Sequence, residues 1–218
     1  MNNLNLISAR NAIADSKLND ALGFYKLAYE EMPDNLEVEW FYLFGAVTEP
    51  VNSSTADNFV RLADIFYPTL KYIATLEEGP DKQAVVYTMI KGFAPLHDVV
   101  HDSMIKALAM NRSVILMEDV VRVDMAKRVD NEKIAEDILA IFGEAAPYCF
   151  YAADIWKEMI AKRFKRSPYR NYQDKGKELW FDELAKRIKK YDPSYELPQF
   201  KQAGCITFGD AARVTPGT

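Results

Sequence analysis

Two histidines, one helical turn apart, are the residues of this chain whose types and spacing best suit chemistry. His97 and His101 are its only histidines. Residues four apart lie on one face of a helix, so both imidazoles could reach the same metal ion. A third ligand would come from one of three acidic residues further along the chain: Glu118, Asp119 or Asp124.

The string H-D-x-x-H resembles the H-E-x-x-H motif of zinc proteases, with Asp98 in place of the glutamate. The resemblance implies a metal-dependent hydrolase, but aspartate sets the general base back by one methylene. A structural interpretation stands beside it. In that interpretation both histidines flank the apolar stripe of Phe93 and Met104 and bond to a carboxylate or to the backbone. We prefer it, because a two-ligand pattern often arises by chance.

A basic segment near residue 165 is the second candidate for chemistry. From residue 157 to 190 the chain carries 12 Lys/Arg against 5 Asp/Glu, a local charge of +7. Cations mixed with aromatic rings suit phosphate contact and base stacking in a nucleic-acid binder. The alternative is a solvated helix end whose positive charge complements the helix dipole. The candidate phosphate contacts are Lys162, Arg163, Lys165, Arg166 and Arg170.

Composition and motifs exclude several classes of enzyme and of location. There is no G-x-S-x-G, no P-loop and no G-x-G-x-x-G, so the sequence carries no motif for acyl transfer or nucleotide binding. The net charge of −5 argues against a simple nucleic-acid binder. Cys149 and Cys205 match no metal spacing. With no basic, apolar leader and no run of about 20 apolar residues, we expect a cytoplasmic protein without a membrane span or cofactor.

The elements that position these residues are predicted to be helices, and the first four form a duplicated unit. Three residues in the first third of the chain recur at an offset of 35: Ala21, Ala28 and Pro33 reappear as Ala56, Ala63 and Pro68. Apolar residues at helical spacing surround each set, and small residues allow close approach of antiparallel helices. Each proline is expected to mark the end of a helix.

This spacing resembles the tetratricopeptide repeat (TPR), with its pattern W-x2-L-G-x2-Y followed by A-x3-F-x2-A-x4-P. Two degenerate copies cover residues 2–70. The first carries Ala21, Tyr25, Ala28 and Pro33, and the second carries Trp40, Leu43, Ala56, Val60, Ala63 and Pro68. The chain departs from the family at Phe44, which occupies a small-residue position, and in its period of 35 rather than 34.

The resemblance implies a ligand groove lined by the first helix of each repeat. Arg10 and Phe41 would point into that groove, and exposed aromatic rings at Phe41, Tyr42 and Phe44 would form a contact patch for a partner. The alternative is that these rings pack against the neighbouring repeat.

The sequence therefore predicts an all-α protein of stacked TPR-like hairpins, longer helices and an irregular tail. The predicted segments are hairpins over 1–70, a helical bundle over 71–190 and a docked tail over 191–218. The expected function is a non-catalytic scaffold or adaptor that binds a peptide or protein segment in a helical groove. The metal-dependent hydrolase and the nucleic-acid binder remain as alternatives.

Overall fold

The fold is all-α, as the sequence predicts, and its first half is a series of antiparallel helices. The computed structural model describes residues 3–110, 115–126, 131–166, 169–170, 175–199 and 201–202. By contact, the chain divides into two compact units, Met1–Ala152 and Ala153–Thr218, and the boundary lies inside a helix.

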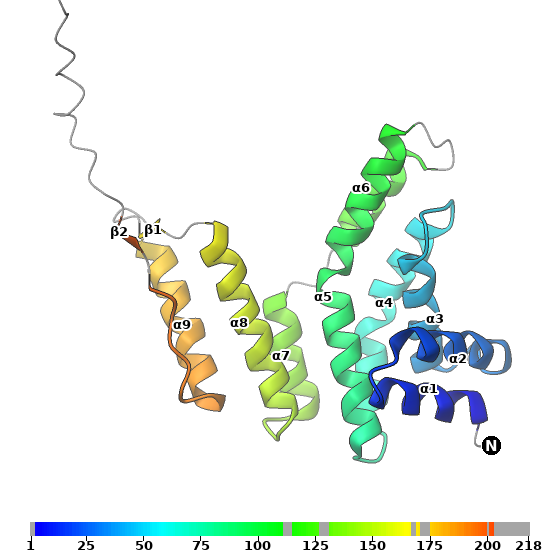
Figure 1. The fold of residues 1–218 in the computed structure, drawn as a ribbon, viewed down its shortest axis with the longest axis horizontal. Helices are drawn as coiled ribbons and strands as arrows, with labels where there is room; N and C mark the ends of the chain where they lie inside the picture. The colour runs from blue at the N-terminus through cyan, green and yellow to red at the C-terminus, as the bar shows by residue number, and fades with distance from the viewer. Residues whose placement is uncertain are drawn as a thin grey trace, which may run out of the picture. The chain divides into compact units, whose positions relative to one another are not determined.

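In the first unit, four helices follow one another as neighbours (Figure 1): α1 (Leu4–Ala14), α2 (Leu18–Glu31), α3 (Leu36–Thr48) and α4 (Thr55–Ala74). Each consecutive pair is in contact, so α1–α2 and α3–α4 are helical hairpins. Asn35 caps α3, because its side-chain oxygen accepts hydrogen bonds from the backbone N–H groups of Glu37 and Val38. Pro33 follows the end of α2, as predicted.

Pro68 does not end its helix, which corrects the prediction for the second copy. The helix α4 continues through it to Ala74. Pro68 is exposed, so the hydrogen bond lost at this residue lies on the side of α4 that faces water. Beyond it, Leu70 and Ile73 are fully buried, and their burial favours continuation of the helix.

The remaining helices of the first unit pack on these hairpins. The long helix α5 (Pro80–Ala109) lies against α1 and α4, α6 (Met117–Met125) lies against α5 and α4, and α7 (Asn131–Phe142) contacts α4. The unit ends within α8 (Tyr148–Arg166).

The second unit holds the rest of α8, then α9 (Lys175–Tyr191) and a two-residue parallel pairing of β1 (Tyr169–Arg170) with β2 (Lys201–Gln202). Trp156 of α8 and Tyr191 of α9 stack with ring centroids 6.4 Å apart. Residues 192–199 are irregular, and most of the predicted tail, including 203–218 with Cys205, lies outside the described residues.

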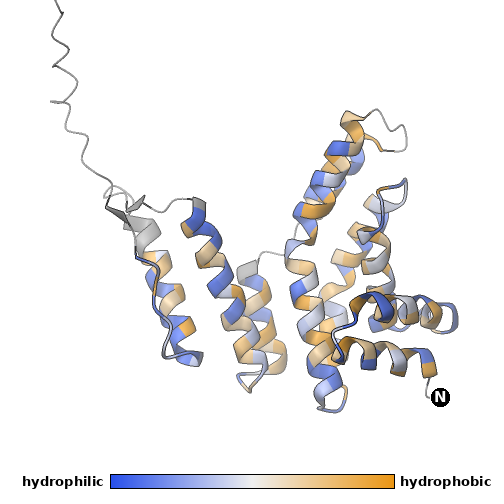
Figure 2. Cartoon of the chain, viewed as in Figure 1, coloured by the Kyte–Doolittle hydropathy of each residue, from blue (hydrophilic) through white to orange (hydrophobic). Residues whose placement is uncertain are grey.

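Polar and apolar residues alternate along the helices (Figure 2). None of the helices among the described residues is both long enough and apolar enough to cross a membrane.

A close approach at Gly92 joins α5 to the hairpins. A Cβ at Gly92 would lie 2.9 Å from two ring atoms of Phe44, closer than real Cβ contacts come. Phe44 has no room to retreat, because its ring stacks on Trp40 at 5.2 Å and is only 6% exposed. Gly92 is therefore required for the packing of α5 on α3.

Gly92→Ala is expected to lower the free energy of unfolding by about 1–3 kcal/mol, because the added methyl overpacks the contact with Phe44. Gly23→Ala is the matched control, since a Cβ at Gly23 meets nothing within 4 Å. That variant should gain up to about 1 kcal/mol from helix propensity alone. Urea unfolding followed by circular dichroism measures both, and equal stability of the two variants would contradict this packing.

Candidate functional site

The two histidines face a carboxylate of α6, but not that of Glu118. His97 Nε2 lies 3.1 Å from Asp124 Oδ1, and His101 Nε2 lies 3.7 Å from the same oxygen. Glu118 is exposed in the first turn of α6, and Asp119 accepts a hydrogen bond from the backbone N–H of Leu116. His97 therefore hydrogen-bonds to a carboxylate between α5 and α6, as in the structural interpretation, whereas His101 lies beyond hydrogen-bond distance of the same oxygen.

No group of three His, Cys, Asp or Glu side chains in the described part of the chain is arranged to hold a metal ion. The structure thus places Asp124 at the histidines, whereas the other two candidate ligands, Glu118 and Asp119, make no hydrogen bond or ion pair with either of them among the described residues.

The basic segment is only partly available for phosphate contact. The Arg163 guanidinium lies 4.4 Å from the centroid of the Trp180 ring, a cation–π contact between α8 and α9. Lys162 and Lys165 are exposed. The side chains of Arg166 and Arg170 lie outside the described residues.

A buried carboxylate holds the first three helices together. Glu37, in the first turn of α3, is fully buried. Arg10 of α1 donates two hydrogen bonds to it, from Nε to Oε1 at 3.0 Å and from Nη2 to Oε2 at 2.6 Å. The Tyr25 hydroxyl of α2 donates a third to Oε1 at 2.8 Å. This hydrogen bond from Arg10 to Glu37 raises the pKa of the guanidinium, so Arg10 stays charged.

The aromatic patch predicted from the sequence is wrong at two of its three rings. Phe41 and Phe44 are buried, with exposed fractions of 0% and 6%, and only Tyr42 is partly exposed. Phe41 stacks on Tyr25 with centroids 4.3 Å apart, so it packs between helices, as the alternative has it. Arg10 does not point freely into a groove either, because Glu37 holds its guanidinium.

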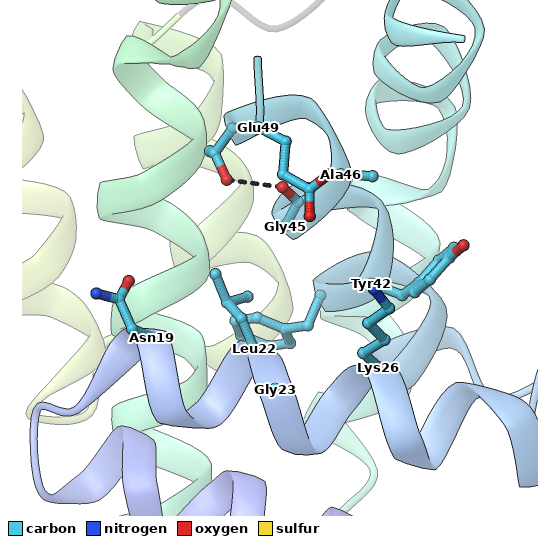
Figure 3. A pocket seen from close by; sticks show the side chains of 10 residues that line it. Asn19, Leu22, Gly23, Lys26, Tyr42, Gly45, Ala46 and Glu49 are labelled. Atoms are coloured by element: carbon cyan, nitrogen blue, oxygen red, sulfur yellow. Dashed lines mark hydrogen bonds between the residues drawn. The ribbon is translucent and has the colours of Figure 1, made fainter. Parts of the chain in front are cut away.

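A hollow of about 380 Å³ lies between α2 and α3, and it includes Phe41 and Tyr42 (Figure 3). Its α2 side is formed by Asn19, Leu22, Gly23 and Lys26, and its α3 side by Phe41, Tyr42, Gly45, Ala46, Thr48 and Glu49. Two of its lining residues are glycines, which add no side chain to it. A Cβ at Gly23 would meet nothing, and one at Gly45 would meet only the Leu22 side chain, at 3.7 Å.

Ring stacking fixes the walls of this hollow. Tyr29 of α2 and Tyr42 of α3 stack at 4.0 Å with an interplanar angle of 3°, next to the stack of Tyr25 on Phe41. These two stacks join α2 to α3 and so hold together the two helices that line the hollow. Its volume lies within the range of small ligand pockets.

A second hollow, of about 410 Å³, lies where the α1–α2 turn meets α5. Its lining carries one charged side chain, Lys91, whose Nζ lies 5.8 Å from the centroid of the Tyr87 ring. The α2–α3 hollow is the better candidate, because it holds Tyr42, the predicted contact ring that is partly exposed, and has charged residues of both signs.

No family model, no curated protein and no solved structure matches the chain. The resemblance to TPR proteins therefore remains a prediction from the residues that carry it. It also implies a groove lined by first helices, whereas this hollow lies between the second helix of one hairpin and the first helix of the next.

Sequence reasoning missed the α2 half of the hollow. Gly23 is the signal that could have found it, because glycine in the middle of a helix costs about 1 kcal/mol relative to alanine. Gly23 is exposed, and a Cβ there would meet no atom within 4 Å, so close packing does not require a glycine at this position.

Burial raises the pKa of the Tyr25 phenol well above its ordinary value, and the neighbouring Glu37 raises it further. The folded chain therefore keeps this proton at a pH where the unfolded chain loses it. The protonated Tyr25 phenol therefore contributes fully to the free energy of unfolding below pH about 10, and this contribution is lost as the pH rises further.

The free energy of unfolding should therefore fall with pH above about 10, and Tyr25→Phe should reduce that slope by up to about 1.4 kcal/mol per pH unit. Urea titrations of both proteins from pH 8 to 11 measure the slopes. Identical slopes would show that Tyr25 is not a buried, protonated phenol.

Proposed function

We propose that this protein is a non-catalytic adaptor that binds a segment of another polypeptide in the α2–α3 hollow. The observation that carries the proposal is the hollow itself. Two glycines are among its lining residues, and two ring stacks join the helices on either side of it. A site formed before binding loses little conformational entropy when it takes its ligand.

The chemistry of the lining supports a peptide rather than a reaction. Leu22 and Ala46 supply apolar contact, while Asn19 and Tyr42 supply groups that can hydrogen-bond to a peptide backbone. Neither histidine lines the hollow. Grooves between stacked helices suit such segments, because the ligand lays apolar side chains between the ridges.

Gly23→Leu should abolish partner binding, because a leucine side chain there projects from α2 into a space that is otherwise open. Asn11→Leu is the matched control: it adds the same apolar side chain at an exposed position of α1 outside the hollow. The measurement is affinity capture from native lysate with the wild type and both variants. The dissociation constant of each captured protein is then determined by calorimetry.

The expected result is a protein bound by the wild type and by Asn11→Leu, with at least ten-fold weaker binding to Gly23→Leu. If every captured protein binds Gly23→Leu as tightly as the wild type, the hollow is not the partner site.

A further inference from the structure

The α2–α3 hollow has a direction, because its two helices are antiparallel. Contacts between them pair Tyr29 with Tyr42 and Leu22 with Gly45, so the residue number falls along α2 as it rises along α3. Lys26 therefore lies at the Tyr42 end of the hollow, as Figure 3 shows, and Glu49 lies towards the other end.

The separation of the two charges follows from helix geometry. Tyr42 lies in α3, and Glu49 comes seven positions later, directly after the last residue of that helix, which corresponds to about 10 Å along the helix axis. An extended peptide advances about 3.3 Å per residue, so it covers that distance in three residues.

Both charges are free to take a ligand. Lys26 and Glu49 are exposed, and within the described part of the chain neither makes an ion pair or a hydrogen bond through its side chain. Glu49 also stands directly after the last residue of α3, and the last turn of that helix holds no basic residue. A carboxylate at a helix C-terminus opposes the helix dipole, so local stability does not explain it.

We propose that the hollow selects an extended peptide segment with an acidic group at one end and a basic group about three residues away. The acidic group pairs with Lys26 and the basic group pairs with Glu49. The inference rests on the proposed function, since it names the ligand of the same hollow. The two charges are of opposite sign, so they also fix the direction in which the segment lies.

The lining between the charges limits the residues between them. Leu22 and Ala46 give that stretch an apolar surface, and Gly23 and Gly45 leave room for side chains of the ligand. Asn19 carries a side-chain amide that has no partner among the described residues, and it can bond to the backbone of the segment. Uncharged residues are therefore expected between the acidic and basic positions.

Selection from a phage-displayed library of random dodecapeptides tests this with the full-length protein as bait. The baits are the wild type, Gly23→Leu and the charge-swapped double variant Lys26→Glu with Glu49→Lys. Both swapped residues are exposed, so the swap should leave the fold unchanged. Wild-type clones should carry an acidic and a basic residue three positions apart in one fixed order, and the swapped bait should select the reverse order.

Synthetic peptides from the wild-type selection should bind the swapped variant at least ten-fold more weakly, because like charges then meet at both ends. One outcome is clones that bind the wild type but not Gly23→Leu, and yet show no fixed order of acidic and basic residues, or the same order with the charge-swapped bait. That result overturns the inference and leaves the proposed function intact. Clones that bind Gly23→Leu equally well, or no clones at all, overturn both.

Discussion

One buried carboxylate determines how the first three helices of this protein pack. Glu37 lies in the first turn of α3 and takes hydrogen bonds from Arg10 of α1 and Tyr25 of α2. A carboxylate without partners could not remain charged there, because removal from water costs several kcal/mol. The favourable N-terminal end of the helix dipole and the bidentate guanidinium together offset that cost. The three helices are therefore bound to a single packing arrangement.

That arrangement leads directly to the candidate site. The tyrosine that donates to Glu37 also stacks on Phe41, and a second stack of Tyr29 on Tyr42 lies next to it. The stacks set α2 against α3 at a fixed distance and register. The two glycines then leave a hollow at the surface, with Lys26 and Glu49 at its ends. The buried carboxylate of Glu37 thus helps to position the α2–α3 hollow, although it does not line it.

The helices could be predicted from the sequence because their signals are local. Apolar periodicity and Pro33 each act within one or two turns, and the structure confirms that α2 ends just before Pro33. Pro68 resembled Pro33 locally, but its outcome depended on burial of Leu70 and Ile73 further along α4. The prediction of an exposed aromatic patch is wrong for the same reason. Phe44 is buried because Gly92, far along the chain, makes room for it.

The role of Glu37 could not be predicted either. In the sequence it is an acidic residue in a helical first turn, which is common on protein surfaces. Only tertiary packing brings Arg10 to it across 27 residues. The same applies to Lys26 and Glu49, whose significance comes from the antiparallel pairing of α2 with α3 and not from any spacing in the chain.

A double-mutant cycle on Arg10 and Glu37 tests the central claim most directly. The variants Arg10→Met, Glu37→Leu and the double variant are unfolded in urea beside the wild type. Either single change leaves a charge unpaired and should cost about 3–5 kcal/mol, whereas the double change should cost far less than the sum. A coupling of about 2 kcal/mol or more is predicted. Additive effects, within about 0.5 kcal/mol, would contradict the claim that this pair binds the helices together.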